Sequence, residues 1–422
     1  MDPVFDAQYL RMKDPFNDAG HAIAVAYRQD AEVDHVHAAD VLLAHQDNVP
    51  QLRDALPRLQ RDFAQPQPAY GDLVLLPIGG EGHQDEDGYL TVPDALDLIE
   101  QRVGTERMFA DGEQMATAVH IMHTAKLCAA TEPEVPGAPK PAPYPPPAAP
   151  GDGQGILLGI SDTGLWEQPS PDLHPWLVGV DGVADQPSPT VAGGRLSIPY
   201  EGGHGTMVAG MARCMAPGAG VYVGNHFPYS GGTLEYMLAR DLETLITDRS
   251  PAVINLSAGG YTCGDAPPRS FVEFHRRHPD VTLVAAAGND STDRPFWPAA
   301  FDWAVAVGAL GADLQNLAWF SNYGDWVDVY ALGEGVVNAF ATGVYTYDEP
   351  PKKPATQVFD GMARWSGTSF SAPLVAGLIV AEMARNGSSA ADAWPRVLGT
   401  AANTGGFGPV LLPPRDASSP AR

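Results

Sequence analysis

Cysteine is scarce in this sequence: the 422 residues include only three, Cys128, Cys214 and Cys263. An odd and sparse count excludes a disulfide framework and is typical of a reducing compartment. The first residues, MDPVFDAQYLRMKDP, also lack the basic start and apolar core of a secretory signal. We therefore expect a cytoplasmic protein, or a secreted one if an export signal has been removed.

Basic side chains and long apolar runs are also few. The sequence has 25 Lys and Arg against 51 Asp and Glu, a formal net charge of −26. Nucleic acids and anionic membrane surfaces both bind basic faces, so neither is expected as a partner. The longest apolar stretch, around 373–384, is shorter than the roughly 20 residues that cross a bilayer. The hydrophobic content of 44% is nevertheless sufficient for a full core.

Proline divides the chain. Nine of the eighteen residues from Pro133 to Pro150 are proline, a composition that favours an extended backbone without core. We interpret residues 131–153 as a linker, with a proline-motif ligand for a partner as the alternative. The linker separates an N-terminal region (residues 1–130) from a C-terminal region (residues 154–405), which a tail follows at 406–422.

The N-terminal region has the pattern of a small α+β domain. Two alternating or apolar runs predict strands, and three stretches with helical spacing predict helices. The strands are Ala22–Tyr27 and Leu73–Leu76, and the helices are Gln51–Phe63, Pro93–Arg102 and Gln114–Ala129. Residues 1–150 carry 24 acidic and 10 basic side chains, net −14, so the excess negative charge is densest in this part.

The C-terminal region alternates strands with helices, which predicts a parallel sheet flanked by helices, an α/β fold. The predicted strands are Gly155–Ser161, Gly220–Val223, Ala252–Leu256 and Val281–Ala286, and the predicted helices are Met207–Cys214, Thr233–Thr247 and Ser270–Arg277. In such sheets the chemistry gathers beyond the carboxyl ends of the strands.

Four short segments each place one reactive side chain among glycines or small residues. They are SDTG around Asp162, GHGT around His204, AAGN ending at Asn289, and GTSFSAP around Ser369. A serine hydroxyl becomes a nucleophile when an imidazole takes its proton, and a carboxylate orients that imidazole. An asparagine amide can stabilise a developing oxyanion. Ser369 precedes a run of small residues, so it is expected at a helix start, where its own N–H and the helix dipole also face the oxyanion.

These segments, over roughly residues 154–405, resemble the subtilase (subtilisin-like serine protease) family. The order Asp, His, Ser along the chain is that of the family, and the segment Gly367–Pro373 is similar to its nucleophile motif. The resemblance implies that Asp162 is the triad aspartate, His204 the general base, Ser369 the nucleophile and Asn289 the oxyanion-hole asparagine. It further implies a serine endopeptidase with a subtilisin-like fold.

The resemblance also implies where substrate lies. Ser257, Ala258 and Gly259 match the edge segment that pairs with substrate as an added strand. Ala286, Ala287 and Gly288 match the opposite wall of the primary specificity pocket. Phe296 stands where the family often has a small residue on the pocket floor, so we expect a shortened pocket that favours small side chains.

Two departures and two alternatives accompany this interpretation. Met207 replaces a second histidine of the family pattern, which lies outside the triad, and residues 168–199 are interpreted as a surface insertion near the cleft. Taken singly, each motif is also explained as a turn or a helix cap. Taken together, the alternative is a non-catalytic peptide-binding scaffold that uses the same edge segment without turnover.

No cofactor is expected for the chemistry. Structural calcium is common in subtilases, and Asp85–Asp87 could bind it, although a solvated acidic loop is the simpler interpretation. His120 and His123 lie one helical turn apart in the predicted helix, and the N-terminal region also contains His35 and His37. A metal site is conceivable there, but an exposed helical face is preferred, and no metal ligands are assigned.

The N-terminal region has two interpretations. Subtilases are commonly made with an N-terminal propeptide that blocks the cleft, which would make this region an intramolecular inhibitor released by a cut between Glu132 and Gly153. Alternatively, it is a permanent regulatory domain whose negative charge suits docking to a basic partner. In either case the substrate is a protein or peptide, and a dedicated domain suggests a specific target.

Overall fold

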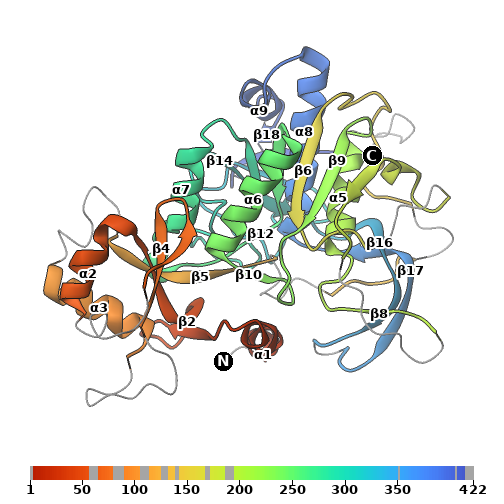
Figure 1. Cartoon of the computed structure of the whole chain (residues 1–422). Helices are drawn as coiled ribbons and strands as arrows, with labels where there is room; N and C mark the ends of the chain where they lie inside the picture. Colours follow the sequence, from red (N-terminus) through yellow and green to blue (C-terminus); the bar gives the residue numbers. More distant parts are fainter. Residues whose placement is uncertain are drawn as a thin grey trace.

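The computed structural model describes residues 3–56, 65–78, 90–104, 114–124, 132–137, 142–166, 172–185, 194–349, 352–403 and 406–413. Its C-terminal region is built on a nine-stranded sheet (Figure 1) with the order β18-β19-β15-β14-β13-β11-β6-β9-β7. Neighbouring strands are parallel except for β18 and β19. In chain order these strands are β6 (Leu157–Asp162), β7 (Val180–Gly182), β9 (Gly220–Asn225), β11 (Val253–Leu256), β13 (Leu283–Ala286), β14 (Ala304–Leu310), β15 (Val329–Leu332), β18 (Ala402–Asn403) and β19 (Pro409–Leu411).

Helices cover both faces of this sheet. The helices are α5 (His204–Met215), α6 (Glu235–Arg249), α7 (Arg269–Arg277), α8 (Thr368–Asn386) and α9 (Ala390–Leu398). Helices α5 and α8 pack together in one hydrophobic core, whereas α6 and α7 belong to a second core on the other face. The strands are apolar runs because both of their faces are covered. The predicted α/β class with a parallel, helix-flanked sheet is therefore confirmed.

A smaller antiparallel hairpin lies beside α5. It consists of β16 (Val336–Thr346) and β17 (Thr356–Trp365), and β8 (Ser197–Ile198) adds to β16. The predicted insertion at 168–199 is only partly a surface insertion. Its described residues supply β7, which is the edge strand of the main sheet, and β8, and they bury Leu177 and Val180.

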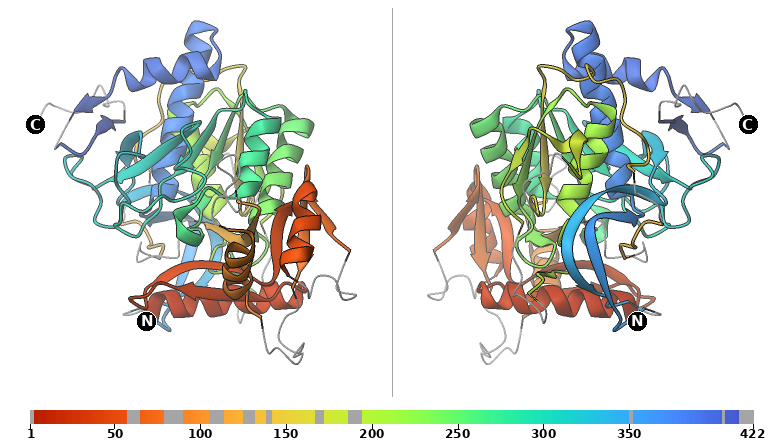
Figure 2. Two further views of the ribbon diagram at one scale, coloured as in Figure 1. Left: turned by 90° about the vertical axis from the view of Figure 1, so that its left-hand side faces the viewer. Right: turned by 90° about the vertical axis from the view of Figure 1, so that its right-hand side faces the viewer.

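The N-terminal region is α+β, as predicted. Its elements are α1 (Pro3–Asp18), β1 (Ile23–Tyr27), β2 (Val33–His45), α2 (Val49–Ala55), β3 (Gln67–Tyr70), β4 (Leu73–Pro77), α3 (Val92–Val103) and β5 (Ala116–Thr124). The strands form a second sheet in the order β10-β5-β2-β4-β3, with β1 on β2 and β12 on β5. Two of these strands, β10 (Gly232–Leu234) and β12 (Ala258–Gly259), come from the C-terminal region. The sheet therefore joins the two regions through β5, and Figure 2 shows the N-terminal region (red and orange) packed along one side of the C-terminal region.

The helix predicted at Gln114–Ala129 is wrong. Residues Ala116–Thr124 form strand β5, and all nine are buried. A fully buried apolar run shows no alternation of polar and apolar residues, so its sequence does not distinguish the two-residue period of a strand from the 3.6-residue period of a helix. The β-branched residues of ATAVHIMHT favour a strand, and neighbours on both edges (β10 on one, β2 and β12 on the other) settle it.

Other elements differ from the sequence interpretation in extent. The predicted helix at Gln51–Phe63 begins earlier as α2 and is described only to Leu56, while α1 and β2 were not predicted. Three residues of the predicted tail, Pro409–Leu411, form β19 and pair with β15 inside the main sheet. The C-terminal region therefore extends beyond residue 405.

The described parts of the proline-rich linker lie against the C-terminal region. Glu134 forms two backbone hydrogen bonds with Arg364 of β17, at 2.9 and 2.7 Å. Tyr144 pairs with Val337 of β16, and the Ala148 N–H donates to the Cys214 carbonyl of α5 at 2.7 Å. These segments are docked along the surface of the C-terminal region and do not hang free as a tether.

Among the residues that the structure describes, no helix is both long and apolar enough to cross a membrane.

Candidate active site

An aspartate and a histidine meet at the carboxyl edge of the main sheet. Asp162 is the last residue of β6, and His204 is the first residue of α5. The His204 ring nitrogen Nδ1 lies 2.7 Å from Asp162 Oδ1, and both side chains are buried. Glycines on either side of His204 make this approach possible. Gly203 has φ of +84°, and a Cβ on Gly205 would lie 2.4 Å from the Gly164 carbonyl oxygen.

A hydrogen-bond network holds this pair in place. The Thr163 N–H donates to Asp162 Oδ1 at 2.8 Å, and Thr163 Oγ1 accepts from the Gly205 N–H at 3.1 Å. Asp185 Oδ2 accepts from the Gly203 N–H at 2.8 Å. Asp185 was not singled out in the sequence, because it lies between two proline-rich stretches and only the fold brings it to the start of α5.

A second histidine lies behind the aspartate and was also missed. Nδ1 of His226 is 2.8 Å from Ser161 Oγ, and the His226 N–H donates to the Asp162 carbonyl at 2.8 Å. Burial lowers the pKa of His226 to about 4, so its ring is neutral at physiological pH. A neutral ring adds no second positive charge beside the Asp162–His204 pair.

Ser369 lies at the start of α8, as predicted. It is the second residue of the helix, so its backbone N–H belongs to the first turn, where the N–H groups have no partner inside the helix. Its Oγ donates to the Ser257 carbonyl oxygen at 3.2 Å, and Ser257 Oγ donates back to the Ser369 carbonyl at 2.8 Å. Ser369 is therefore hydrogen-bonded to the predicted substrate edge.

One aromatic neighbour of His204 comes from the start of α8, and the other is the last residue of β17. The ring of Phe370, the residue after Ser369, lies 5.4 Å from the His204 ring, and the Trp365 ring lies 5.6 Å away. Asp162, His204 and Ser369 are thus gathered around the N-terminus of α8, although each comes from a different element. The fold brings Asp162 and His204 into contact and places the His204 ring against the residue that follows Ser369.

Asn289 follows β13 and faces the same helix start. Its Oδ1 accepts hydrogen bonds from both the N–H and the hydroxyl of Thr368, each at 2.9 Å. Because both bonds engage the carbonyl side of the amide, the Nδ2 donor lies on the opposite side. A Cβ placed on Gly367 would be 3.7 Å from this Nδ2, so the donor lies beside the turn that carries Ser369.

The predicted substrate edge is occupied by the N-terminal region. Strand β5 is antiparallel to both β12 and β10, and it lies between them. His123 is opposite Gly259 on one side and Gly232 on the other, and Thr124 is opposite Ala258. The Thr124 N–H also donates to the Gly231 carbonyl at 2.8 Å.

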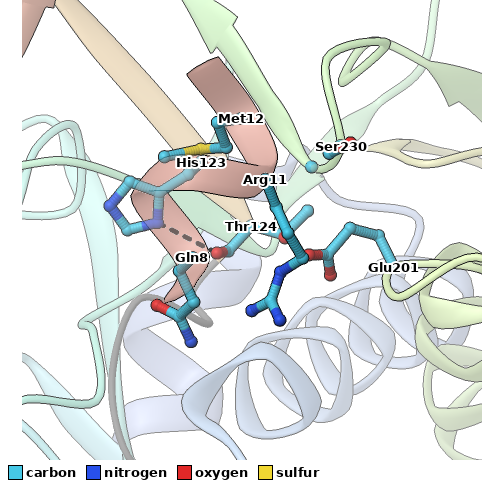
Figure 3. A pocket seen from close by; sticks show the side chains of 8 residues that line it. Gln8, Arg11, Met12, His123, Thr124, Glu201 and Ser230 are labelled. Carbon is cyan, nitrogen blue, oxygen red and sulfur yellow. Dashed lines mark hydrogen bonds between the residues drawn. The ribbon is translucent and has the colours of Figure 1, made fainter. Parts of the chain in front are cut away.

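Helix α1 covers the end of β5. Figure 3 shows Gln8, Arg11 and Met12 of this helix lining a small pocket with His123 and Thr124. Arg11 also pairs with Asp348 of the C-terminal region and lies over the Tyr200 ring, 3.5 Å from its centroid. The helix therefore bridges β5 and the C-terminal region.

Phe296 lies between the two predicted walls of the specificity pocket. A Cβ on Gly259 would be 2.4 Å from the Phe296 ring, and one on Gly288 would be 3.0 Å from it. The ring is 1% exposed and packs against Tyr261, with 5.2 Å between ring centroids. Ala286 and Ala287 of the opposite wall are fully buried.

The predictions about histidines and metals change with the structure. His120 and His123 lie on the buried strand β5, so they do not form an exposed helical face. Within the described residues, one group of three metal-ligating side chains lies close together: Asp34, His35 and Cys263. The acidic run Asp85–Asp87 and Cys128 lie outside the described residues.

Known proteins with similar sequences are subtilases and other serine proteinases. The sequence profile of the subtilase family matches residues 153–410. Thermitase from Thermoactinomyces vulgaris is 30% identical over 268 residues, which are 61% of this chain and 85% of thermitase. An extracellular serine proteinase from Thermus sp. strain Rt41A is 35% identical over 128 residues, which are 30% of this chain and 27% of that protein.

One solved structure is similar over most of the chain. It is fervidolysin from Fervidobacterium pennivorans, described as a keratinolytic enzyme related to subtilisin. The two structures have a TM-score of 0.56 at 17% identity, over 93% of this chain and 62% of fervidolysin. This similarity is one of fold. Because the aligned part is 93% of this chain, it includes most of the N-terminal region as well as the C-terminal region.

Proposed function

This chain belongs to the subtilase family and is a serine endopeptidase that acts on protein or peptide substrates. We propose that Asp162, His204 and Ser369 are its catalytic triad. The observation that carries the assignment is the buried 2.7 Å contact between His204 Nδ1 and Asp162 Oδ1, beside the helix start that holds Ser369. The bond to Asp162 fixes the imidazole tautomer, so Nε2 is the basic nitrogen.

The reaction follows from these positions. Ser369 leaves its bond to the Ser257 carbonyl, gives its proton to His204 Nε2 and attacks the substrate carbonyl carbon. Asn289 Nδ2 and the Ser369 N–H hold the tetrahedral oxyanion. His204 then protonates the leaving amine, and water repeats the sequence on the acyl-enzyme.

Peptide hydrolysis by single variants tests this assignment. We expect Ser369→Ala to lower kcat roughly 10⁵–10⁶-fold, because the nucleophile and base act as a unit. Ser371→Ala removes a hydroxyl two residues further along α8, which donates to the Ala331 carbonyl, and kcat should stay within about tenfold. Equal hydrolysis by Ser369→Ala and the parent would refute the mechanism, and no hydrolysis by the parent would favour the peptide-binding scaffold.

We also propose that the N-terminal region is an intramolecular inhibitor. Its strand β5 pairs with Ala258 and Gly259, which the family resemblance assigns to substrate, so it occupies the edge that a peptide would use. Thr124 lies opposite Ala258, next to the Ser257 whose carbonyl accepts from Ser369. Thr124, the last residue of β5, therefore pairs with the edge one residue away from the partner of the nucleophile.

This geometry moves the expected cut upstream of the range predicted from the sequence. We expect the mature enzyme to start after Thr124 and no later than Glu132, which is itself docked by accepting the Asp348 N–H at 2.8 Å. Mass spectrometry of the purified chain over time measures this start. An active enzyme that keeps all 422 residues would instead support the permanent docking domain.

The cofactor and location expectations stay predictions. The proposed chemistry needs no cofactor. An increase in the melting temperature on addition of calcium would reveal a structural calcium site of the kind that subtilases often have. Cys214 and Cys263 are free, as expected in a reducing cytoplasm, whereas the Thermus relative is named as extracellular. Detection of the chain in the medium of intact cells would decide for secretion.

A further inference from the structure

We propose that Asp34, His35 and Cys263 form a zinc site at the junction of the two regions. Asp34 and His35 lie at the start of β2, in the N-terminal region, while Cys263 follows β12 in the C-terminal region. One donor atom from each residue lies within 4.8 Å of the other two. Donors around a tetrahedral zinc ion are about 3.3–3.8 Å apart, given bonds of about 2.0–2.3 Å, so small side-chain rotations complete the site.

One nitrogen of His35 faces the Asp34 donor. The His35 side chain is 3% exposed, and its Nδ1 lies 2.9 Å from Asp34 Oδ2. This separation is close to the spacing of two donors around one zinc ion. Zinc therefore binds Nδ1 in place of its proton, and Nε2 carries the proton of the neutral ring.

The Asp34 carboxylate divides its two oxygens between different tasks. Oδ1 accepts from Arg28 Nε at 3.1 Å and from Arg294 Nη2 at 3.0 Å, while Oδ2 faces His35. Asp265 pairs with the same two arginines, at 3.1 and 2.8 Å. The two guanidinium charges are therefore balanced by two carboxylates, which leaves the Oδ2 side available to a cation.

Further contacts fix the third ligand. The Cys263 N–H donates to His120 Nε2 at 3.2 Å, and His120 Nδ1 is 2.8 Å from Oε1 of the fully buried Glu235. The His120 ring also packs against the His35 ring, with 5.3 Å between centroids. The backbone of Cys263 is thus oriented by the strand that is proposed to block the cleft. Such outer contacts are typical of metal sites, where they hold the ligands in position.

The donor set selects the metal. One sulfur, one imidazole and one carboxylate suit zinc, whereas calcium and magnesium prefer all-oxygen sites. A cavity lined by Asp34, His35, His37 and Cys263 opens beside the donors, so an ion has a path in and water can fill a fourth position. As the zinc–sulfur bond forms, the Cys263 thiol releases its proton to solvent.

The proposed zinc site links the N-terminal region to the C-terminal region. Two ligands come from the N-terminal region and one from the C-terminal region, so all three meet only while the regions are docked. Zinc therefore holds the inhibitor on the enzyme, and its removal loosens that contact. This consequence rests on the proposed inhibitory role of the N-terminal region, whereas the binding of zinc does not.

The test is a cobalt titration of the full chain carrying Ser369→Ala, freed of metal and confirmed intact by mass. We expect one cobalt ion per chain, with a thiolate-to-cobalt charge-transfer band that zinc abolishes and excess calcium does not. Cys263→Ser should remove the band, and His35→Gln and Asp34→Asn should each weaken binding about 100-fold or more. Cys214→Ser, which changes a buried thiol on α5, should leave the titration unchanged.

The outcomes separate this site from the peptidase assignment, because binding is measured on an inactive chain. No thiolate band in the folded parent would overturn the site, even if Cys263→Ser failed to fold. Calcium displacing the cobalt, or loss of the band in Cys214→Ser, would overturn it too. Cobalt binding as expected, with a parent that hydrolyses no peptide, would leave the site standing and refute only the proposed function.

Discussion

At the scale of single residues, the proposed active site combines catalytic side chains that could be predicted from the sequence with supporting side chains that could not. Asp162, His204, Asn289 and Ser369 stand in short glycine-rich motifs, so their chemistry could be predicted. Asp185 and His226 act through the backbone around Asp162 and His204. Neither has a motif of its own, because the fold alone brings them near.

Asn289 gives the first residue-scale prediction. Its amide is oriented by two hydrogen bonds from Thr368 to Oδ1, which leave Nδ2 beside Gly367, in the turn that precedes α8. Asn289→Ala should therefore lower kcat by about 10²–10³ with little change in KM, because the lost bond forms only in the transition state. Asn386→Ala, at the far end of the same helix, is the control. A rise in KM at constant kcat would show instead that Asn289 binds ground-state substrate.

Phe296 gives the second residue-scale prediction. Its buried ring lies between Gly259 and Gly288, so it closes the space for a large side chain before the cut. The parent should prefer Ala, Ser or Gly there in a residue-resolved peptide library, and Phe296→Ala should extend that preference to larger apolar residues. A parent that prefers Phe, Tyr or Arg would contradict this account.

At the scale of elements, the error about β5 is the most instructive. The elements of the main sheet followed from buried apolar runs alternating with helices, which is a local signal. Strand β5 is set by its partners β2, β10 and β12, and β10 and β12 lie more than 100 residues later. Its apolar run fitted a helix equally well, and only pairing with distant strands decides between the two.

Strand pairing by β5 can be tested through one hydrogen bond. Thr124→Pro removes the N–H that donates to the Gly231 carbonyl, whereas Thr124→Val keeps it. In the Ser369→Ala chain, amide exchange across β10 and β12 should become about fivefold faster with Thr124→Pro, since a net hydrogen bond contributes about 1 kcal/mol. The Val variant should match the parent. Equal exchange in all three would mean that β5 does not protect this edge.

At the scale of the whole molecule, two regions share one sheet, and a histidine is buried where they meet. Burial lowers the pKa of His123 from 6.5 to about 4. In the unfolded chain the ring takes up a proton below about pH 6.5. Its contribution to stability is therefore complete above that pH and is lost as the pH falls from about 6.5 to about 4.

This sign makes a measurable prediction for the intact chain. Between pH 7.5 and pH 5 the neutral, buried ring of His123 should account for about 2 kcal/mol of lost unfolding free energy. Denaturant unfolding of the Ser369→Ala chain with His123→Gln should show a loss smaller by that amount. An unchanged pH dependence in His123→Gln would show that the ring is not held neutral.

The central claim is that this enzyme hydrolyses peptide bonds with Ser369, activated by His204 and Asp162. A fluorophosphonate reacts only with a serine so activated, and peptide mapping locates the adduct. We predict one adduct per active chain, on Ser369, present in Ser371→Ala and abolished by His204→Ala. An adduct on another serine, or equal labelling of the His204→Ala protein, would contradict the account.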